Sequence, residues 1–177
     1  MKSSAIALGL ALSTTFAFAQ TPYAGMQARP IKALSDKDMA DLKAGRGMGL
    51  ALPAELNGYP GPSHVLENAD ALALTIEQRE RTKALFEAMK AEAIPVGMQL
   101  IDQEARLDQL FAARQITPAS LAAVTAEIGA TQARLRATHL KYHLTMMTVL
   151  TPEQIEKYQS LRGYSAGGTM QHQHRHD

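Results

Sequence analysis

The sequence predicts an all-α protein built around one long antiparallel helical hairpin. Two long segments, 76–114 and 118–149, place apolar residues at steps of three and four, the period of a helix that is buried along one face. The short break between them, at 115–117, makes the second helix fold back on the first. The composition agrees: with four Phe, five Tyr and no Trp, the core must be filled by Ala, Leu and the nine Met.

Residues 1–19 have the pattern of a secretory signal peptide. Lys2 supplies the positive start, an apolar run covers 5–18, and Ala17-Phe18-Ala19 is a typical cleavage site. We therefore expect a mature chain that starts at Gln20 in the periplasm. The apolar run is short and does not recur, so no integral membrane segment is expected. The chain has no Cys for a disulfide or a lipid anchor.

Charge and motifs argue against two broad functions. Without Lys2, the basic residues, 18 in the whole chain, equal the 17 acidic ones in number, so nucleic acid is not an expected partner. An enzyme is not expected either, because the sequence has no Cys nucleophile, no H-E-x-x-H motif and no phosphate-binding glycine loop. The glycines of AGRGMG follow a short helical segment instead of a strand.

Residues 20–73 read as an N-terminal arm of short helices without a core of its own. Ser35 is the expected N-cap of a helix through Leu42, which the glycines of AGRGMG end. A turn-rich connector with Asn57-Gly58 and two prolines follows. A second short helix is expected over 63–71, and it carries His64 and Glu67.

Residues 74–164 are expected to form the helical domain. Within the first long helix, Pro95 predicts a kink or a split into two helices, because proline removes a backbone donor. Thr117 as N-cap and Pro118 at the first helical position start the second long helix. Two helices alone would leave one apolar side of the hairpin exposed. This side must be covered by a short helix over 152–161, by the arm or by a second copy of the chain. Residues 165–177 have no apolar period and are expected to be a disordered tail.

The pentapeptide pattern Leu-Thr-x-x-Gln occurs twice, as LTIEQ at 74–78 and as LTPEQ at 150–154. Each copy predicts a capping box, in which the threonine accepts the backbone N–H of the glutamine and the glutamine reaches back to the threonine N–H. Such a cap stabilises a helix by roughly 1 kcal/mol, so the boxes mark helix starts. The residues of the two boxes are Leu74, Thr75 and Gln78, and Leu150, Thr151 and Gln154.

With this pair of boxes around a hairpin, behind a signal peptide, the chain resembles the LTxxQ family of bacterial envelope proteins. That family includes periplasmic chaperones and stress-pathway inhibitors of the Spy and CpxP type and metal-binding sensors of the CnrX and ZraP type. The resemblance covers residues 71–164 and implies a Spy/CpxP-like all-helical protein that dimerises into a curved cradle. It implies an ATP-independent chaperone of the envelope stress response that holds unfolded or misfolded envelope proteins.

The resemblance leaves a second function open, that of a periplasmic heavy-metal sensor or metal-resistance protein. A sensor kinase or an anti-sigma factor would then be a partner. The metal-sensing members carry a His and a Met one turn apart before the second box, and His143 and Met147 have that spacing here. Those members also carry an H-x-x-x-H pair near the mature N-terminus, where this chain has only His64.

His139 and His143 are the most direct metal candidates, because they stand four apart on one helical face in line with the apolar stripe. Such a pair can bind Zn, Cu, Ni or Co, with Met147 one turn further on as a thioether ligand. In the folded hairpin the pair should lie opposite Met89 and Ala93. The alternative is that both histidines are hydrogen-bonded core residues.

Three further groups of residues could add to such a site. Glu92 is the carboxylate of the hairpin expected nearest to the pair, and His64 and Glu67 can approach from the arm. In the tail, His172, His174 and His176 alternate with polar residues, a pattern that predicts weak, pH-dependent binding of a divalent ion. No cofactor is needed for the expected fold.

Overall fold

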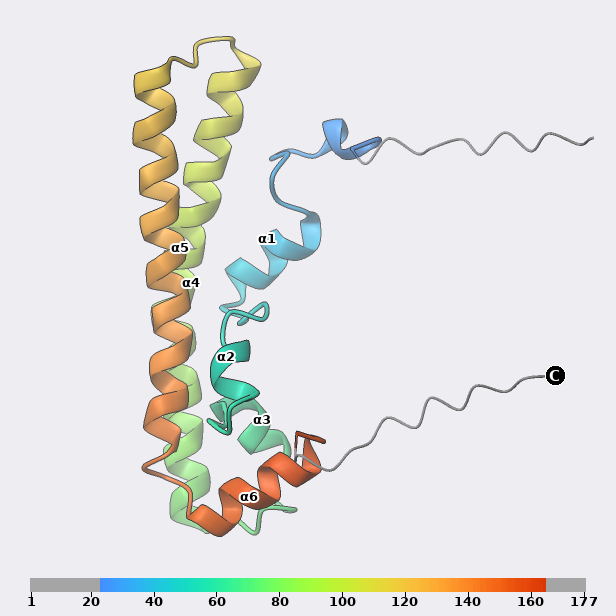
Figure 1. The fold of residues 1–177 in the computed structure, drawn as a ribbon, viewed down its shortest axis with the longest axis vertical. Coiled ribbons are helices and arrows are strands. Elements are labelled where there is room, and N and C mark those ends of the chain that lie inside the picture. The colour runs from blue at the N-terminus through green and yellow to red at the C-terminus, as the bar shows by residue number, and fades with distance from the viewer. Residues whose placement is uncertain (1–22, 165–177) are drawn as a thin grey trace, which may run out of the picture.

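The computed structural model describes residues 23–164, which contain six α-helices, one short 3-10 helix and no strand (Figure 1). The predicted all-α fold is confirmed. The predicted signal peptide and the tail histidines His172, His174 and His176 lie outside the described residues. No helix between residues 23 and 164 has the length and the apolar character needed to cross a bilayer.

The hairpin consists of α4 (Ile76–Ala112) and α5 (Pro118–Met146), which pack antiparallel (Figure 1). The chain reverses at the predicted position, residues 115–117. There the Thr117 hydroxyl accepts the backbone N–H of Ser120 at 3.1 Å and caps the start of α5. After a short turn, α6 (Pro152–Leu161) lies across the base of the hairpin.

Pro95 lies inside an unbroken α4, so the predicted split of this helix is wrong. Proline has no N–H, and the carbonyl of Ala91 therefore has no helical donor. Both residues are exposed, and water can satisfy a carbonyl on the solvent side of a helix. Packing against α5 and α1 along the other side keeps the helix continuous.

The arm lies along one side of the hairpin (Figure 1). It contains the 3-10 helix η1 (Met26–Ala28) and the helices α1 (Asp36–Lys43), α2 (Leu52–Glu55) and α3 (Pro62–Glu67). Ser35 caps α1 in a complete capping box, as expected. The second expected helix is shorter than 63–71, since Asn68 already ends α3. Helix α1 packs on α4, α2 on α5, and α3 on both, so the arm shares the core of the hairpin.

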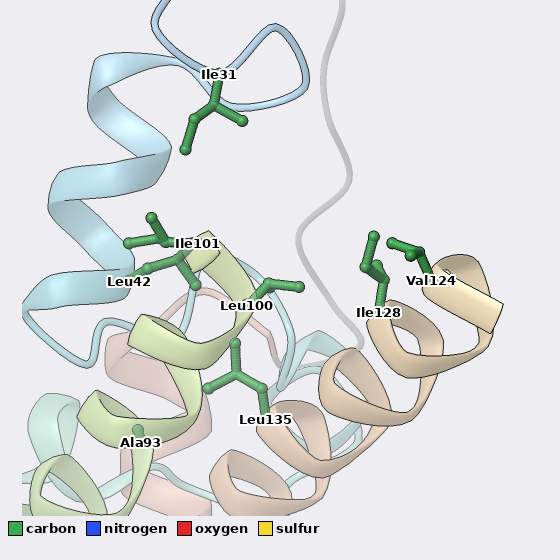
Figure 2. Close-up of a cluster of buried hydrophobic side chains, with 8 residues drawn as sticks. All are labelled: Ile31, Leu42, Ala93, Leu100, Ile101, Val124, Ile128 and Leu135. Atoms are coloured by element: carbon green, nitrogen blue, oxygen red, sulfur yellow. The ribbon is translucent and has the colours of Figure 1, made fainter. Parts of the chain in front are cut away.

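Two apolar clusters hold these parts together. The first joins α1, α4 and α5 through Ile31, Leu42, Ala93, Leu100, Ile101, Val124, Ile128 and Leu135 (Figure 2). The second joins α3, α6 and the base of the hairpin through Val65, Ala69, Leu72, Leu74, Met146, Val149, Leu150 and Tyr158. On α5, His139 and His143 lie between Leu135 of the first cluster and Met146 of the second.

The two Leu-Thr-x-x-Gln boxes contact each other. Both capping boxes are complete, at Thr75 for α4 and at Thr151 for α6. The amide of Gln78 donates to the side-chain oxygen of Gln154 at 2.8 Å, and the amide of Gln154 donates back at 3.0 Å. Each amide also donates to a distant carbonyl, Gln78 to Val149 at 2.9 Å and Gln154 to Leu72 at 3.3 Å. The repeated motif thus joins the start of α4 to the start of α6.

Replacing either glutamine by alanine is expected to destabilise the fold by about 1–2 kcal/mol, because the change removes a cap and leaves the partner amide unpaired. The double variant Gln78→Ala, Gln154→Ala should lose less than the sum of the two single variants, since the shared bonds are lost only once. Urea unfolding of the four proteins measures this coupling. Additive losses would show that the amide pair contributes nothing beyond its two caps.

Asp41 fixes the glycine loop that follows α1. Its carboxylate is buried and accepts hydrogen bonds from Lys37 Nζ and Arg46 Nε, each at 2.5 Å. These two cations, Lys37 first, hold the pKa of Asp41 below its usual value of 3.8. The loop 44–49 is thereby tied to α1 on one side and forms part of a cavity on the other.

Because the folded pKa of Asp41 is lowered, its contribution is present above the unfolded value and is lost as the pH falls through the folded one. Asp41→Asn should therefore lower the urea midpoint at neutral pH, and the gap to the wild type should close below the unfolded value of 3.8. Urea midpoints measured in steps from neutral to acid pH test this. If the difference in urea midpoint between the two proteins stays constant as the pH falls, the charge of the Asp41 carboxylate does not contribute to stability.

Candidate metal-binding site

A cavity of about 570 Å³ lies between the arm and the hairpin, and the three histidines predicted in this part of the chain line it. His64 comes from α3, while His139 and His143 come from α5. The other side chains with polar or sulfur atoms on its wall are Arg46, Glu55, Ser63, Glu67, Met89 and Lys90. The fold therefore brings together imidazoles that are 75 and more positions apart in the sequence, since α3 packs on both helices of the hairpin.

Two of the histidines are oriented through one ring nitrogen. His143 Nδ1 donates to the carbonyl of Tyr59 at 2.7 Å, and His64 Nδ1 lies 3.1 Å from Glu67 Oε2. A carbonyl only accepts, so His143 carries a proton on Nδ1, and Nε2 is the nitrogen left for an ion. Histidines that bind metals in proteins are held in this way, with the second nitrogen on a carbonyl or carboxylate.

His139 is buried, with 2% of its surface exposed, and its Nε2 has no hydrogen-bond partner. Its Nδ1 lies close to the backbone of Gly47 in the glycine loop. Burial, with a smaller effect of the nearby His143, lowers the pKa of His139, so the ring is neutral at neutral pH. An unpartnered buried nitrogen costs about 1–3 kcal/mol, which a metal ion bound to it would offset.

Glu55 is the other residue of the cavity wall with an unpartnered buried atom, and no motif in the sequence pointed to it. The residue is 6% exposed, and Oε2 has no hydrogen-bond partner although it lies 3.8 Å from His143 Nδ1. The short helix α2 carries it to the cavity. Met89, 6% exposed, is the only thioether on the wall of this cavity.

Two residues expected near the histidine pair lie elsewhere. Met147, the C-cap of α5, lines a shallow groove formed with α6 and does not line the cavity of the histidines. Glu92 accepts hydrogen bonds from Lys141 Nζ and, at 2.8 Å, from Tyr142 Oη, and it does not line the cavity. Both bonds, Lys141 first, lower the pKa of Glu92, while burial and Glu92 raise the pKa of Tyr142 to about 12. Helical spacing placed the two histidines on the buried face of α5, but it did not identify Met89 and Glu55 as the thioether and the carboxylate that line their cavity.

The donor types around the cavity fit a borderline divalent metal. Imidazole and thioether groups suit Zn, Cu and Ni, and carboxylates complete such sites. Within residues 23–164, however, no three His, Asp or Glu side chains are close enough to hold an ion as they stand. The unpartnered Nε2 of His139 and Oε2 of Glu55 show that the donors are available, and binding requires them to close on the ion.

Comparison with known proteins gives one match. The profile of a protein family described as heavy-metal resistance matches residues 46–157, well over half of the chain. The matched segment contains both Leu-Thr-x-x-Gln boxes and the three cavity histidines. No curated protein and no solved structure matches the chain.

Proposed function

Because the chain belongs to the heavy-metal resistance family, we propose that it binds a divalent heavy-metal ion in the cavity between its arm and its hairpin. The family contains the LTxxQ-type helical proteins, in agreement with the resemblance of the two boxes. The observation that carries the proposal is the set of three histidines, from two distant segments, on the wall of one cavity. The proposal assigns binding and no catalytic step.

Three features of the cavity support metal binding over a purely structural role for the histidines. His143 and His64 are oriented by their Nδ1 atoms, which leaves Nε2 for an ion. His139 is neutral and lacks the hydrogen bond expected of a buried core histidine. Glu55 and Met89 add a carboxylate and a thioether from two further elements.

Calorimetry with Zn, Cu, Ni and Co tests the proposal. The parent protein is the full chain with His172→Gln, His174→Gln and His176→Gln, so that the tail cannot bind the ion. The double variant His139→Ala, His143→Ala should lose more than about 100-fold in affinity for the preferred metal, since losing a ligand costs more than losing a residue that only orients a ligand. Equal affinity in the parent and the double variant would refute the cavity as the site.

Two carboxylates provide a matched comparison in the same assay. Glu55→Gln removes the charge that lies in the cavity, whereas Glu92→Gln removes one that lies outside it. We expect weaker binding for the first variant and unchanged binding for the second. Both changes keep the shape of the side chain. A difference in metal affinity between the two variants therefore shows that the location of the carboxylate inside the cavity matters.

A chaperone-like activity is the second candidate function. Several large apolar side chains of the hairpin are exposed, among them Ile76 at 78%, Leu144 at 60% and Phe111 at 54%. Apolar side chains on the surface can hold unfolded chains weakly. A light-scattering assay on an aggregating client tests this activity, and no suppression at equimolar protein would remove it. The homodimer that the resemblance implies stays a prediction.

A periplasmic location completes the proposal. Proteins of this family are typically periplasmic, and residues 1–19 have the pattern of a signal peptide. Mass spectrometry of the protein from the envelope fraction should give a chain that starts at Gln20. A full-length chain in the cytoplasmic fraction would contradict this location.

A further inference from the structure

A buried hydrogen bond joins the C-terminal helix to the cavity. Tyr158 on α6 is fully buried, with 0% of its surface exposed, and its hydroxyl donates to Glu55 Oε1. Glu55 lies on α2, more than 100 positions earlier in the sequence. Burial, together with this carboxylate, raises the pKa of Tyr158, so the hydroxyl stays protonated and remains a donor.

The two oxygens of Glu55 face different parts of the molecule. Oε1 is held from α6 by Tyr158 and lies 3.5 Å from Nε of Arg162, the residue that ends α6. Oε2 has no hydrogen-bond partner, and it lies 3.8 Å from His143 Nδ1. One oxygen is thus fixed by the C-terminal helix, and the other lies unpartnered beside His143 on the residue that lines the cavity.

We propose that α6 is coupled to the metal site through Glu55, with Tyr158 and Arg162 as positioning residues. The inference rests on the proposed function, because it assumes that an ion binds in the cavity. Carboxylates that ligate metals are oriented by hydrogen bonds to their other oxygen, and Tyr158 supplies such a bond. The C-terminal helix contributes no residue to the cavity wall, so Glu55 is its link to the ion.

The coupling acts in both directions. If docked α6 raises the affinity for the ion by holding Glu55 in place, the bound ion must strengthen the docking of α6 by the same factor. The helix would therefore be more firmly held in the metal-bound protein than in the metal-free one. A partner that binds only the firmly docked or only the loosely docked form of α6 would respond to the metal concentration.

Two variants that each remove one tyrosine hydroxyl test the proposal, in the full chain with His172→Gln, His174→Gln and His176→Gln. Tyr158→Phe removes the bond to Glu55, and Tyr142→Phe removes a similar bond to Glu92, which lies outside the cavity. Calorimetry with Zn²⁺ should show about 10- to 100-fold weaker binding for Tyr158→Phe and unchanged binding for Tyr142→Phe. Equal affinities of the two variants would overturn the proposal.

Hydrogen exchange of the backbone amides of α6 gives an independent readout of the coupling. Addition of Zn²⁺ to the parent protein should slow exchange in residues 152–162, and this effect should be absent in Tyr158→Phe. If the parent binds Zn²⁺ through its histidines but exchange in α6 does not change, the coupling is wrong and the proposed function stands. If the parent binds no Zn²⁺, Cu²⁺, Ni²⁺ or Co²⁺ at all, the proposed function fails, and the coupling with it.

Discussion

Replacing Gly97 by alanine is expected to detach the arm from the hairpin. A Cβ at this position of α4 would lie 2.6 Å from the backbone carbonyl oxygen of Leu42 in α1, a distance that real contacts do not reach. Backbone cannot move aside as a side chain end can, so α1 must shift away. Overpacking of this kind costs about 1–3 kcal/mol, and it outweighs the gain of up to about 1 kcal/mol in helix propensity.

Gly129→Ala is the matched control, because Gly129 is exposed in α5 and an added Cβ would contact nothing within 4 Å. The control should be slightly more stable than the wild type, by up to about 1 kcal/mol, because it gains helix propensity alone. Thermal unfolding measures the stability of both variants, and limited proteolysis in the loop 44–49 reports detachment of the arm. If the Gly97→Ala variant is as stable and as protease-resistant as the control, the close contact of α1 with α4 is contradicted.

Replacing Gly61 by alanine is expected to weaken metal binding with little effect on the backbone. Gly61 precedes α3 in an extended conformation, with φ −90° and ψ 148°, which alanine adopts freely. Its added Cβ would lie 2.7 Å from His143 Cε1 and 2.9 Å from Nε2. The imidazole must turn away and give up its bond to Tyr59, and the loss of such an orienting bond weakens metal binding by about 10- to 100-fold.

Zinc calorimetry on the parent with the substituted tail, on its Gly61→Ala variant and on its Gly129→Ala variant checks this expectation. Gly129→Ala should bind as the parent does, since its new methyl group lies on the exposed side of α5. Circular dichroism should show the same helix content in all three proteins. Unchanged affinity of Gly61→Ala would mean that His143 is not a ligand.

Helix starts were predictable because they depend on local chemistry. Thr75, Thr117 and Thr151 each cap a helix as expected, and each is followed three positions on by the side chain that completes the box. Their bonds join residues three positions apart, so a short stretch of sequence contains all the information. The same holds for Ser35 in the arm.

Pro95 and α2 show where local information was insufficient. A proline inside a helix is tolerated when the freed carbonyl faces water, and sequence alone does not tell which side of α4 is exposed. The helix α2 has only four residues and no side-chain cap, so its existence depends on its packing on α5 and on the hydrogen bond from Tyr158 of α6, both far away in the sequence.

The candidate site was predictable in part. Helical spacing placed His139 and His143 on the buried face of α5, and His64 was the one histidine available from the arm. The hairpin geometry also placed Met89 opposite the pair, although not as a ligand, whereas Glu55 was not found because the approach of α2 to these imidazoles depends on how the arm packs. The contact of Gln78 with Gln154 is of the same kind: the motif predicted each cap, while only the fold shows that the two caps touch.

X-ray absorption spectroscopy at the edge of the bound metal tests the central claim most directly. The sample is the parent protein with the substituted tail, loaded with one equivalent of Zn²⁺. The metal should have at least two imidazole nitrogens at about 2.0–2.1 Å, and these should be lost in the variant with His139→Ala and His143→Ala. A shell of oxygen atoms alone, or a spectrum that both substitutions leave unchanged, would show that the cavity histidines do not hold the metal.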